Sequence, residues 1–202
     1  MNVRMRRRVA ALLLLLALLL PQAVQADSAS ITCYGEDLTS EQYTLVLDLL
    51  EADPATDTLI PVTHEDEVSL LGDIVPAEKI GSRSLSSARV TLAEEGAGIA
   101  VTVYNIDWVT PQMYASALST AGVQDATIVV AAPVSVSGTA ALAGILKAYE
   151  SAAGTELSAA AKAAAGSEMV LTGDLADIIG SDQAVELIAM VKQAIADVCY
   201  GK

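Results

Sequence analysis

The amino-acid sequence predicts a single domain of the α/β or α+β class, in which helices pack on a small mixed sheet. Three observations predict it. β-rich segments alternate with amphipathic segments between residues 30 and 153. Within this part, a strand, a helix and a second strand over 98–132 have the spacing of a βαβ unit, which predicts parallel strands and a right-handed crossover. The remainder, 155–202, has helical patterning throughout, so we expect a helical C-terminal third.

The first predicted elements are a short strand over 30–34 and a helix over 40–51. Thr39 and Gln42 have the spacing of a capping box, in which each side chain binds a backbone N–H that the first turn leaves free. Apolar residues then recur at helical spacing, so this helix is expected to bury one face.

A second strand and a second helix follow. The segment 58–62 is β-rich, but Pro61 cannot donate a ladder hydrogen bond, which places this strand at an edge of the sheet or near a strand end. Thr63 then caps a short acidic helix over 64–71, and Gly72 ends it. The acidic side chains of its first turn interact favourably with the helix dipole.

Two further β-rich runs, 84–92 and 98–106, are separated by residues 94–97, which read Glu-Glu-Gly-Ala. Acidic residues followed by a glycine have the composition of a hairpin loop. The pattern therefore predicts that these two runs pair directly with each other as a β-hairpin.

The next helix has clear boundary signals. Thr110 precedes it, Pro111 occupies its first position and Gly122 ends it. The segment 126–132 that follows is continuously apolar, as is typical of a strand buried on both faces of a sheet.

The 21 residues between Asp125 and Lys147 carry no charge, which is long enough for a membrane-spanning helix. However, Pro133 and a polar turn at 135–139 interrupt the run, and β-branched residues fill its first half. The sequence therefore predicts a strand, a turn and a helix over 139–153 instead of a span.

Beyond Gly154 the sequence predicts three helical pieces. These are an alanine-rich helix over 158–171, a short piece over 174–179 and a final helix capped by Ser181. In the final helix Cys199 falls on the apolar side, so it is expected to point toward the core.

The N-terminus has the order of a secretory signal peptide. Arginines at positions 4, 6, 7 and 8 precede an apolar run over 9–20, and small residues frame a cleavage site after Ala26. This run is shorter than the roughly 20 residues that a bilayer span requires. We therefore expect a signal peptide over 1–26, a mature domain over 27–202, and a protein that is secreted or held in the cell envelope.

The charge of the chain narrows the class of partner. The formal net charge is −14, and the leader holds four of the 11 basic residues and none of the 25 acidic ones. The mature surface is therefore strongly acidic and would repel the phosphates of nucleic acid and of anionic lipid, so neither is an expected partner. The charge does not identify the partner: a cell-wall component and a small anionic ligand are both compatible with the sequence, and no cofactor and no membrane span after cleavage are expected.

The two cysteines of the chain, Cys33 and Cys199, lie near the two ends of the predicted mature domain. Disulfides persist outside the cytoplasm, so a Cys33–Cys199 bridge and a pair of free thiols are both compatible with the sequence. No metal site is predicted, because one histidine and two distant cysteines lack the ligand spacing of a zinc site.

The turn that contains Ser135, Ser137, Gly138 and Thr139 is the strongest candidate for a ligand site. A strand that leads through such a turn into a helix presents hydroxyls and unpaired N–H groups, which suit a carboxylate or a phosphate. Ordinary N-capping of the helix would use the same residues.

A second polar cluster, Asn105, Asp107 and Trp108, follows the predicted 98–106 strand. If it lay beside the 135–139 turn, the two would line one cleft. Trp108 in this position is equally suited to closing an edge of the core and to stacking on a sugar.

A hydrolase is the competing prediction. Ser137 stands at a strand-to-helix turn, where a nucleophile could lie, and His64 is the only histidine available to it. The nucleophile motif Gly-x-Ser-x-Gly is absent around Ser137. A catalytic pair of carboxylates is the other route, but with 25 acidic residues the sequence singles out no pair.

Several short motifs resemble a known family. They are Ile-Gly-Ser-Arg-Ser at 80–84, Thr-Ala-Gly at 120–122, Ala-Ala-Pro at 131–133, Val-Ser-Gly-Thr-Ala-Ala-Leu at 136–142 and Lys-Ala-Tyr-Glu at 147–150. Together they resemble the YpuA-like family, domain of unknown function 1002, from about Tyr34 to Leu175. The resemblance implies an exported or envelope-associated bacterial protein, and it implies no activity, cofactor or catalytic residue.

Three function classes follow from the sequence. The leading prediction is a non-catalytic extracellular or wall-associated binding protein, because the chain offers polar turns but no convincing nucleophile, metal set or cofactor loop. The second is the extracellular hydrolase built on Ser137 or on a carboxylate pair. The third is a structural component of the envelope that acts by self-association.

Overall fold

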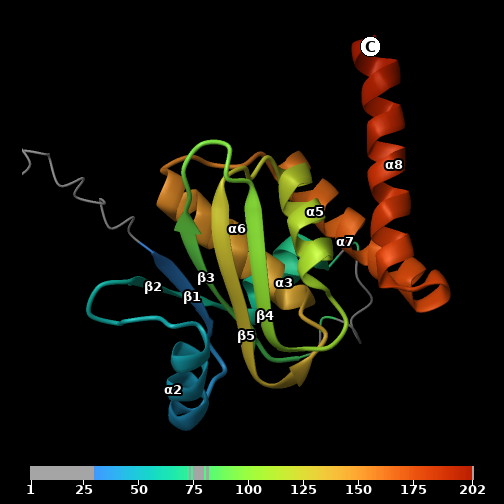
Figure 1. Cartoon of the computed structure of the whole chain (residues 1–202). Coiled ribbons are helices and arrows are strands. Elements are labelled where there is room, and N and C mark those ends of the chain that lie inside the picture. Colours follow the sequence, from blue (N-terminus) through green and yellow to red (C-terminus); the bar gives the residue numbers. More distant parts are fainter. Residues whose placement is uncertain (1–29, 73, 75–79, 81, 202) are drawn as a thin grey trace, which may run out of the picture.

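The computed structural model describes residues 30–72, 74, 80 and 82–201. They form one α/β domain around a mixed sheet of five strands in the order β2-β1-β3-β5-β4 (Figure 1). The strands are β1 (Ile31–Gly35), β2 (Thr58–Val62), β3 (Ser87–Leu92), β4 (Ile99–Ile106) and β5 (Ala126–Val136). The predicted signal peptide and its cleavage site lie outside the described residues.

Strand directions confirm the mixed sheet and the βαβ unit. The pairs β1–β2 and β4–β5 are parallel, whereas β3 runs antiparallel to β1 on one side and to β5 on the other. The strand β2, which contains Pro61, lies at an edge of the sheet as predicted.

The helices begin and end largely where the sequence signals lie. They are α2 (Ser40–Leu49), α3 (His64–Leu71), α5 (Pro111–Ala121), α6 (Thr139–Ala153), α7 (Ala159–Ile179) and α8 (Ser181–Tyr200). The capping box before α2 is formed, and a second one, between Thr63 and Asp66, starts α3. Gly122 ends α5 in the left-handed conformation that glycine adopts without strain.

The predicted hairpin of residues 84–92 and 98–106 is wrong. β3 and β4 form as strands, but β5 lies between them and pairs with both. The turn composition at 94–97 was read correctly, since Gly96 adopts a positive φ of 87°. A local turn does not specify which strands pair, and the most apolar strand gains more by occupying the interior position than the two flanking runs gain by pairing.

The helices cover the two faces of the sheet unequally. α5 and α6 pack on one face of the sheet, and in Figure 1 α6 lies behind the strands. α7 packs against α5. The main core lies there, and Ile128 and Val130 of β5 point into it. On the other face α2 covers Ala131, while Thr127 is exposed, so the prediction of burial on both faces holds only for the middle of β5.

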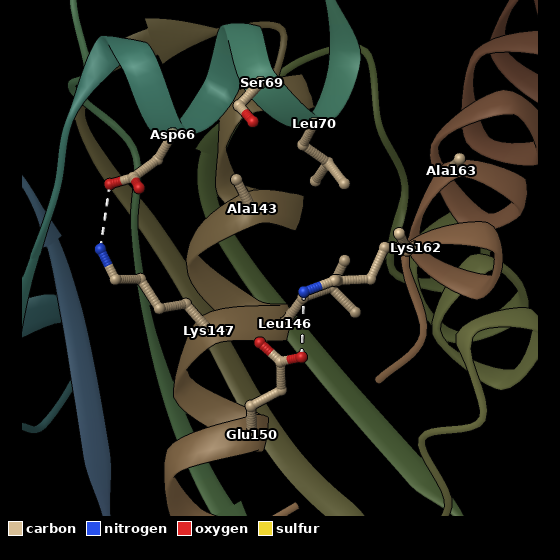
Figure 2. A pocket seen from close by; sticks show the side chains of 10 residues that line it. Asp66, Ser69, Leu70, Ala143, Leu146, Lys147, Glu150, Lys162 and Ala163 are labelled. Atoms are coloured by element: carbon tan, nitrogen blue, oxygen red, sulfur yellow. Dashed lines mark hydrogen bonds and ion pairs between the residues drawn. The ribbon is translucent and has the colours of Figure 1, made fainter. Parts of the chain in front are cut away.

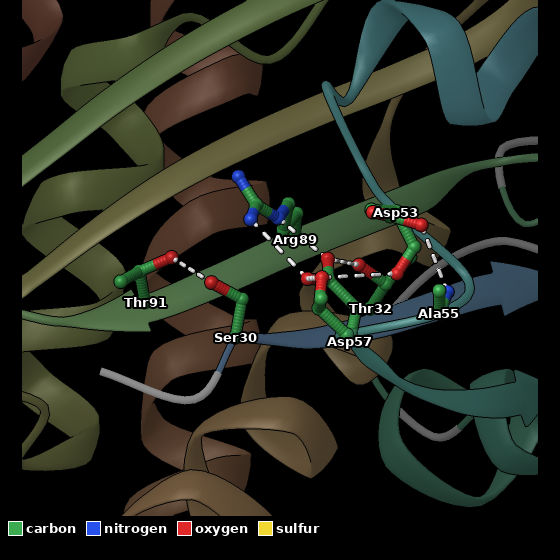
Figure 3. A network of polar contacts seen from close by, with 8 residues as sticks. Ser30, Thr32, Asp53, Ala55, Asp57, Arg89 and Thr91 are labelled. Carbon is green, nitrogen blue, oxygen red and sulfur yellow. Dashed lines mark hydrogen bonds and ion pairs between the residues drawn. The ribbon is translucent and has the colours of Figure 1, made fainter. Parts of the chain in front are cut away.

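On the sheet face opposite the main core, a network of polar side chains links β1, β3 and the loop before β2 (Figure 3). Asp57, which precedes β2, accepts hydrogen bonds from Thr32 of β1 at 3.0 Å and from Arg89 of β3 at 2.6 Å. Ser30 and Thr91 share a further hydrogen bond of 2.7 Å between their hydroxyls. These contacts tie β1 and β3 to the loop that leads into β2.

The C-terminal third is helical as predicted, but its division is different. Residues 159–179 form one continuous helix, α7, which Ser158 caps. Gly173, where a break was expected, is instead a packing position: a Cβ there would lie 2.2 Å from a ring carbon of Trp108. Ser181 is the first residue of α8, and its expected place as the N-cap is taken by Gly180.

The last helix, α8, extends away from the body of the domain (Figure 1). Its first half packs on the chain, with Ala184 and Ile188 buried. Its second half is largely exposed, and so is Cys199, which corrects the expectation that this thiol points toward the core. No helix in the described ranges is long and apolar enough to cross a membrane.

Candidate functional site

Of the predicted 135–139 turn, Ser137 and Gly138 join β5 to α6, whereas Ser135 lies in β5 and Thr139 is the first residue of α6. Gly138 adopts a φ of 90°, and a Cβ at this position would lie 2.5 Å from both the Ile106 side chain and the Tyr114 hydroxyl. The buried Tyr114 hydroxyl donates a hydrogen bond to the Gly138 carbonyl. Burial raises the pKa of Tyr114, so the hydroxyl stays protonated and keeps this bond.

The turn borders a hollow of about 340 Å³. One wall comes from the turn and the first residues of α6, and the other from the segment that precedes β3. The lining residues are Ile80, Ser82, Arg83, Leu85, Ser86, Val136, Ser137, Gly138 and Ala140. Two of the motifs that carry the family resemblance, at 80–84 and 136–142, therefore meet at this hollow, which we call the Arg83 hollow.

Arg83 gives this hollow its electrostatic character. Four basic residues of the described chain lie within 3.1 Å of a carboxylate oxygen: Arg89 at Asp57, Lys147 at Asp66, Lys162 at Glu150 and Lys192 at Glu168. Arg83 is exposed and has no ion-pair partner within the same part of the chain. Among the described residues Arg83 is thus a cation without a paired carboxylate, although the formal net charge of the chain is −14.

Hydroxyls and a helix terminus surround this cation. Ser82, Ser86 and Ser137 line the hollow, and the hydroxyls of Ser137 and Thr139 lie 3.3 Å apart. The N-cap of α6, Gly138, provides no side chain to cap the first backbone N–H groups of the helix. A guanidinium, hydroxyl donors and a helix N-terminus are groups that bind carboxylate and phosphate oxygens.

The second predicted cluster does not join this hollow. The Asn105 side chain donates to the Ala132 carbonyl at 2.7 Å, where the pairing of β4 and β5 is irregular. Trp108 packs on Gly173 of α7, and its ring N–H lies 3.2 Å from an Asp177 carboxylate oxygen. Trp108 thus closes the core edge, which is one of its two predicted roles.

Ser135 and Asp107 lie outside the hollow as well. The Ser135 hydroxyl donates to the exposed Asp107 carboxylate at 2.6 Å. Of the seven predicted ligand residues, Ser137 and Gly138 line the hollow and Thr139 contacts Ser137. The sequence reasoning missed Arg83, although it is one of only two arginines beyond residue 8.

Comparison with known proteins decides the family. A family model described as "Protein of unknown function (DUF1002)" matches residues 34–201. The chain belongs to the DUF1002 family. A DUF1002 relative, the "Uncharacterized protein YpuA" of Bacillus subtilis (strain 168), is 41% identical over 184 residues. These residues are 90% of this chain and 63% of that relative, so the chain spans less than two thirds of the relative's length. A search of solved structures found no significant match.

A larger hollow, of about 430 Å³, lies between α3, α6 and α7 of this DUF1002 domain (Figure 2). Leu70, Ala143 and Leu146 form its apolar part. Its charged groups neutralise one another, since each of its two lysine ammonium groups lies 3.0 Å from a carboxylate oxygen of the same hollow. A ligand here would have to compete with these ion pairs, so we regard the Arg83 hollow as the better site.

The only histidine of the DUF1002 chain lies away from the predicted nucleophile. His64 does not line the Arg83 hollow, and its Nδ1 atom lies 3.7 Å from an oxygen of Glu67. The ranges that the structure describes also hold no group of three or more His, Cys, Asp or Glu side chains arranged for a metal ion.

The possible bridge between Cys33 and Cys199 is not formed in this DUF1002 structure, and both thiols are free. Cys33 is buried on β1 and faces Gly144 of α6, where a Cβ would lie 3.5 Å from the cysteine Cβ. Cys199 is exposed near the end of α8, which projects from the domain.

Proposed function

We propose that this DUF1002 protein is exported and acts outside the cytoplasm as a non-catalytic binding protein, with the Arg83 hollow as its site for a small anionic group. The anionic group is a carboxylate or a phosphate, borne by a cell-wall component or by a small molecule. The observation that carries the proposal is an arginine that has no ion-pair partner among the residues that the structure describes and that lines a hollow with serines, in a strongly acidic chain.

The charge of the whole molecule sharpens this argument. A basic side chain on a strongly acidic surface has many acidic neighbours with which it could form an ion pair. A basic side chain that forms no such pair forgoes that stabilisation unless a bound ligand supplies the negative charge. A hydrogen bond to a charged group contributes about 1.5 to 3 kcal/mol, which corresponds to an affinity change of roughly tenfold or more. The hollow holds a small group, and the rest of a larger ligand would lie on the surface outside it.

Calorimetric titration of the purified mature protein with inorganic phosphate and with citrate tests the proposal. We expect Arg83→Gln to weaken binding by about tenfold or more, because it removes the charge and keeps a polar side chain. Lys162→Gln is the matched control, since it removes a cation that lines the other hollow, and it should leave the affinity unchanged. Absence of binding for both anions, or equal loss in both variants, would refute the site.

The export half of the proposal has its own test. The arginine-rich leader and the small residues around Ala26 support cleavage at that position. Mass spectrometry of the protein from its native culture should find a chain that begins at Asp27, in the medium or the envelope fraction. A cytosolic chain that retains the leader would contradict export. The anion site would still be tested by the calorimetric titration.

Self-association is a second candidate function, favoured by the exposed end of α8. Val191, Ile195 and Val198 continue the spacing of the buried Ala184 and Ile188, and they are 46%, 57% and 85% exposed. Light scattering at high concentration tests this candidate. An Ile195→Gln/Val198→Gln variant should shift an oligomer toward monomer, and a wild-type protein that stays monomeric would exclude the candidate.

A further inference from the structure

A buried carboxylate, that of Glu67, lies next to Ser84, the residue that follows Arg83 in the chain. Glu67 of α3 is 0% exposed, and neither of its carboxylate oxygens has a hydrogen-bond partner within the described part of the chain. The Ser84 hydroxyl, which also affects this carboxylate, is buried and unpartnered as well. Buried polar groups are nearly always hydrogen-bonded and buried charges are paired, so this arrangement calls for a physical explanation.

The groups around Glu67 come from three parts of the chain. His64 lies one turn earlier on α3, with its Nδ1 atom 3.7 Å from the carboxylate. Asp37, from the loop after β1, acts on Glu67 as a second negative charge, and Ser84 belongs to the segment between Ser82 and Ser86. Burial raises the pKa of Glu67, Asp37 raises it further, and Ser84 and His64 act in the opposite direction.

The backbone links this cluster to the Arg83 hollow. Ser84 donates its N–H to the Asp37 carboxylate at 2.8 Å and accepts from the Asp37 N–H at 3.2 Å. Its neighbours Arg83 and Leu85 line the hollow, so the two sides of one short segment face Glu67 and the ligand site respectively. A change in charge at Glu67 therefore acts on Ser84 and Asp37, and through them on the position of Arg83.

We propose that Glu67 is a positioning residue that makes anion binding at the Arg83 hollow depend on pH, an inference that rests on the proposed function. While the buried Glu67 carboxyl holds its proton, it is neutral and adds no second negative charge beside Asp37. When that proton leaves to solvent, an uncompensated carboxylate remains beside Asp37. Repulsion from Asp37 and hydration of the charged Glu67 carboxylate displace Ser84. The Arg83 side chain then no longer lies beside the serines that line the hollow.

Sulfate is the probe that isolates the effect, because it remains doubly charged over the whole pH range of interest. We expect its affinity for the wild-type protein to fall by about tenfold or more as the pH rises and Glu67, whose pKa is raised by burial, loses its proton. Glu67→Gln is a neutral side chain of the same shape, so it should retain binding and lose this pH dependence. Glu65→Gln, which changes an exposed acid on the same helix, should behave like the wild type.

A ligand-free readout separates the two proposals. The Ser84 backbone amide should show an NMR titration in the wild type that Glu67→Gln abolishes, whether or not an anion binds. Sulfate binding that depends on Arg83 but not on pH, or that falls equally in Glu67→Gln, would overturn the inference alone. No sulfate binding at any pH would overturn the proposed function, and with it the regulation of that site.

Discussion

At the scale of single residues, the two cysteines differ in burial, and burial controls how readily a thiol reacts. Cys33 is fully buried on β1, and burial raises its pKa to about 12. The reactive thiolate is therefore scarce at neutral pH, and reagents cannot reach the sulfur. Cys199 is exposed on α8, where reagents can reach its sulfur.

This difference predicts the outcome of a thiol count. Native protein without reductant should react with Ellman's reagent at one thiol, Cys199, and unfolded protein should react at two. Mass mapping of the labelled peptide identifies the residue. An unreduced, unfolded protein that shows no reactive thiol would mean that Cys33 and Cys199 are bridged, in contradiction to the structure.

At the scale of elements, the network at Asp57 holds the β2 edge to the rest of the sheet (Figure 3). The Asp57 side chain is 3% exposed and the Arg89 side chain 25%. Removing one partner of such a pair leaves the other charge buried and uncompensated, which costs more than the pair contributes when intact. Thr32 would lose its hydrogen-bond acceptor as well.

We therefore expect Asp57→Ala to lower the free energy of unfolding by about 3 kcal/mol or more, measured by urea denaturation. Asp53→Ala is the matched control, because the side chain of this exposed aspartate accepts the Ala55 N–H at 2.8 Å in the same loop and the substitution keeps the backbone hydrogen bonds. Its cost should be about 1 kcal/mol. Equal losses in the two variants would show that the ion pair contributes little.

The elements also show which sequence signals sufficed. Capping residues such as Thr39, Thr63 and Thr110 fixed helix starts correctly, because a cap acts on N–H groups within three residues. Strand pairing failed at β3 and β4, because pairing depends on which distant strand gains most from an interior position. The predicted interruption between 171 and 174 is wrong, because Gly173 packs against Trp108, which is distant in sequence.

At the scale of the whole molecule, α8 divides into a packed half and a projecting half. Ile188 is 8% exposed and Ile195 is 57% exposed, although both lie on the apolar side of the same helix. We expect Ile188→Ala to cost roughly 2 to 4 kcal/mol in unfolding free energy and Ile195→Ala less than about 0.5 kcal/mol. Denaturation of the two variants at low protein concentration measures this contrast, and a large loss for Ile195→Ala would show that its side chain is covered in solution.

The candidate site is a property of the whole fold as well. The sequence identified the 137–139 turn, because a strand-to-helix turn with hydroxyls is a local pattern. It could not place Arg83 beside that turn, because the two segments meet only when β3 and β5 pair. Nor could it show that Asn105 and Trp108 point elsewhere, since their partners lie on other elements.

The interior place of β5 also governs how the chain folds. Among the five strands that the structure describes, no two consecutive ones form an antiparallel pair, and every ladder closes a loop that contains at least one helix. Such a topology has a high contact order, because the entropy of loop closure is lost before most strand pairs form. We expect folding on a timescale of about milliseconds to seconds. Because β3 can pair with β5 only after residue 136 has been synthesised, the sheet stays incomplete through most of the synthesis of the chain.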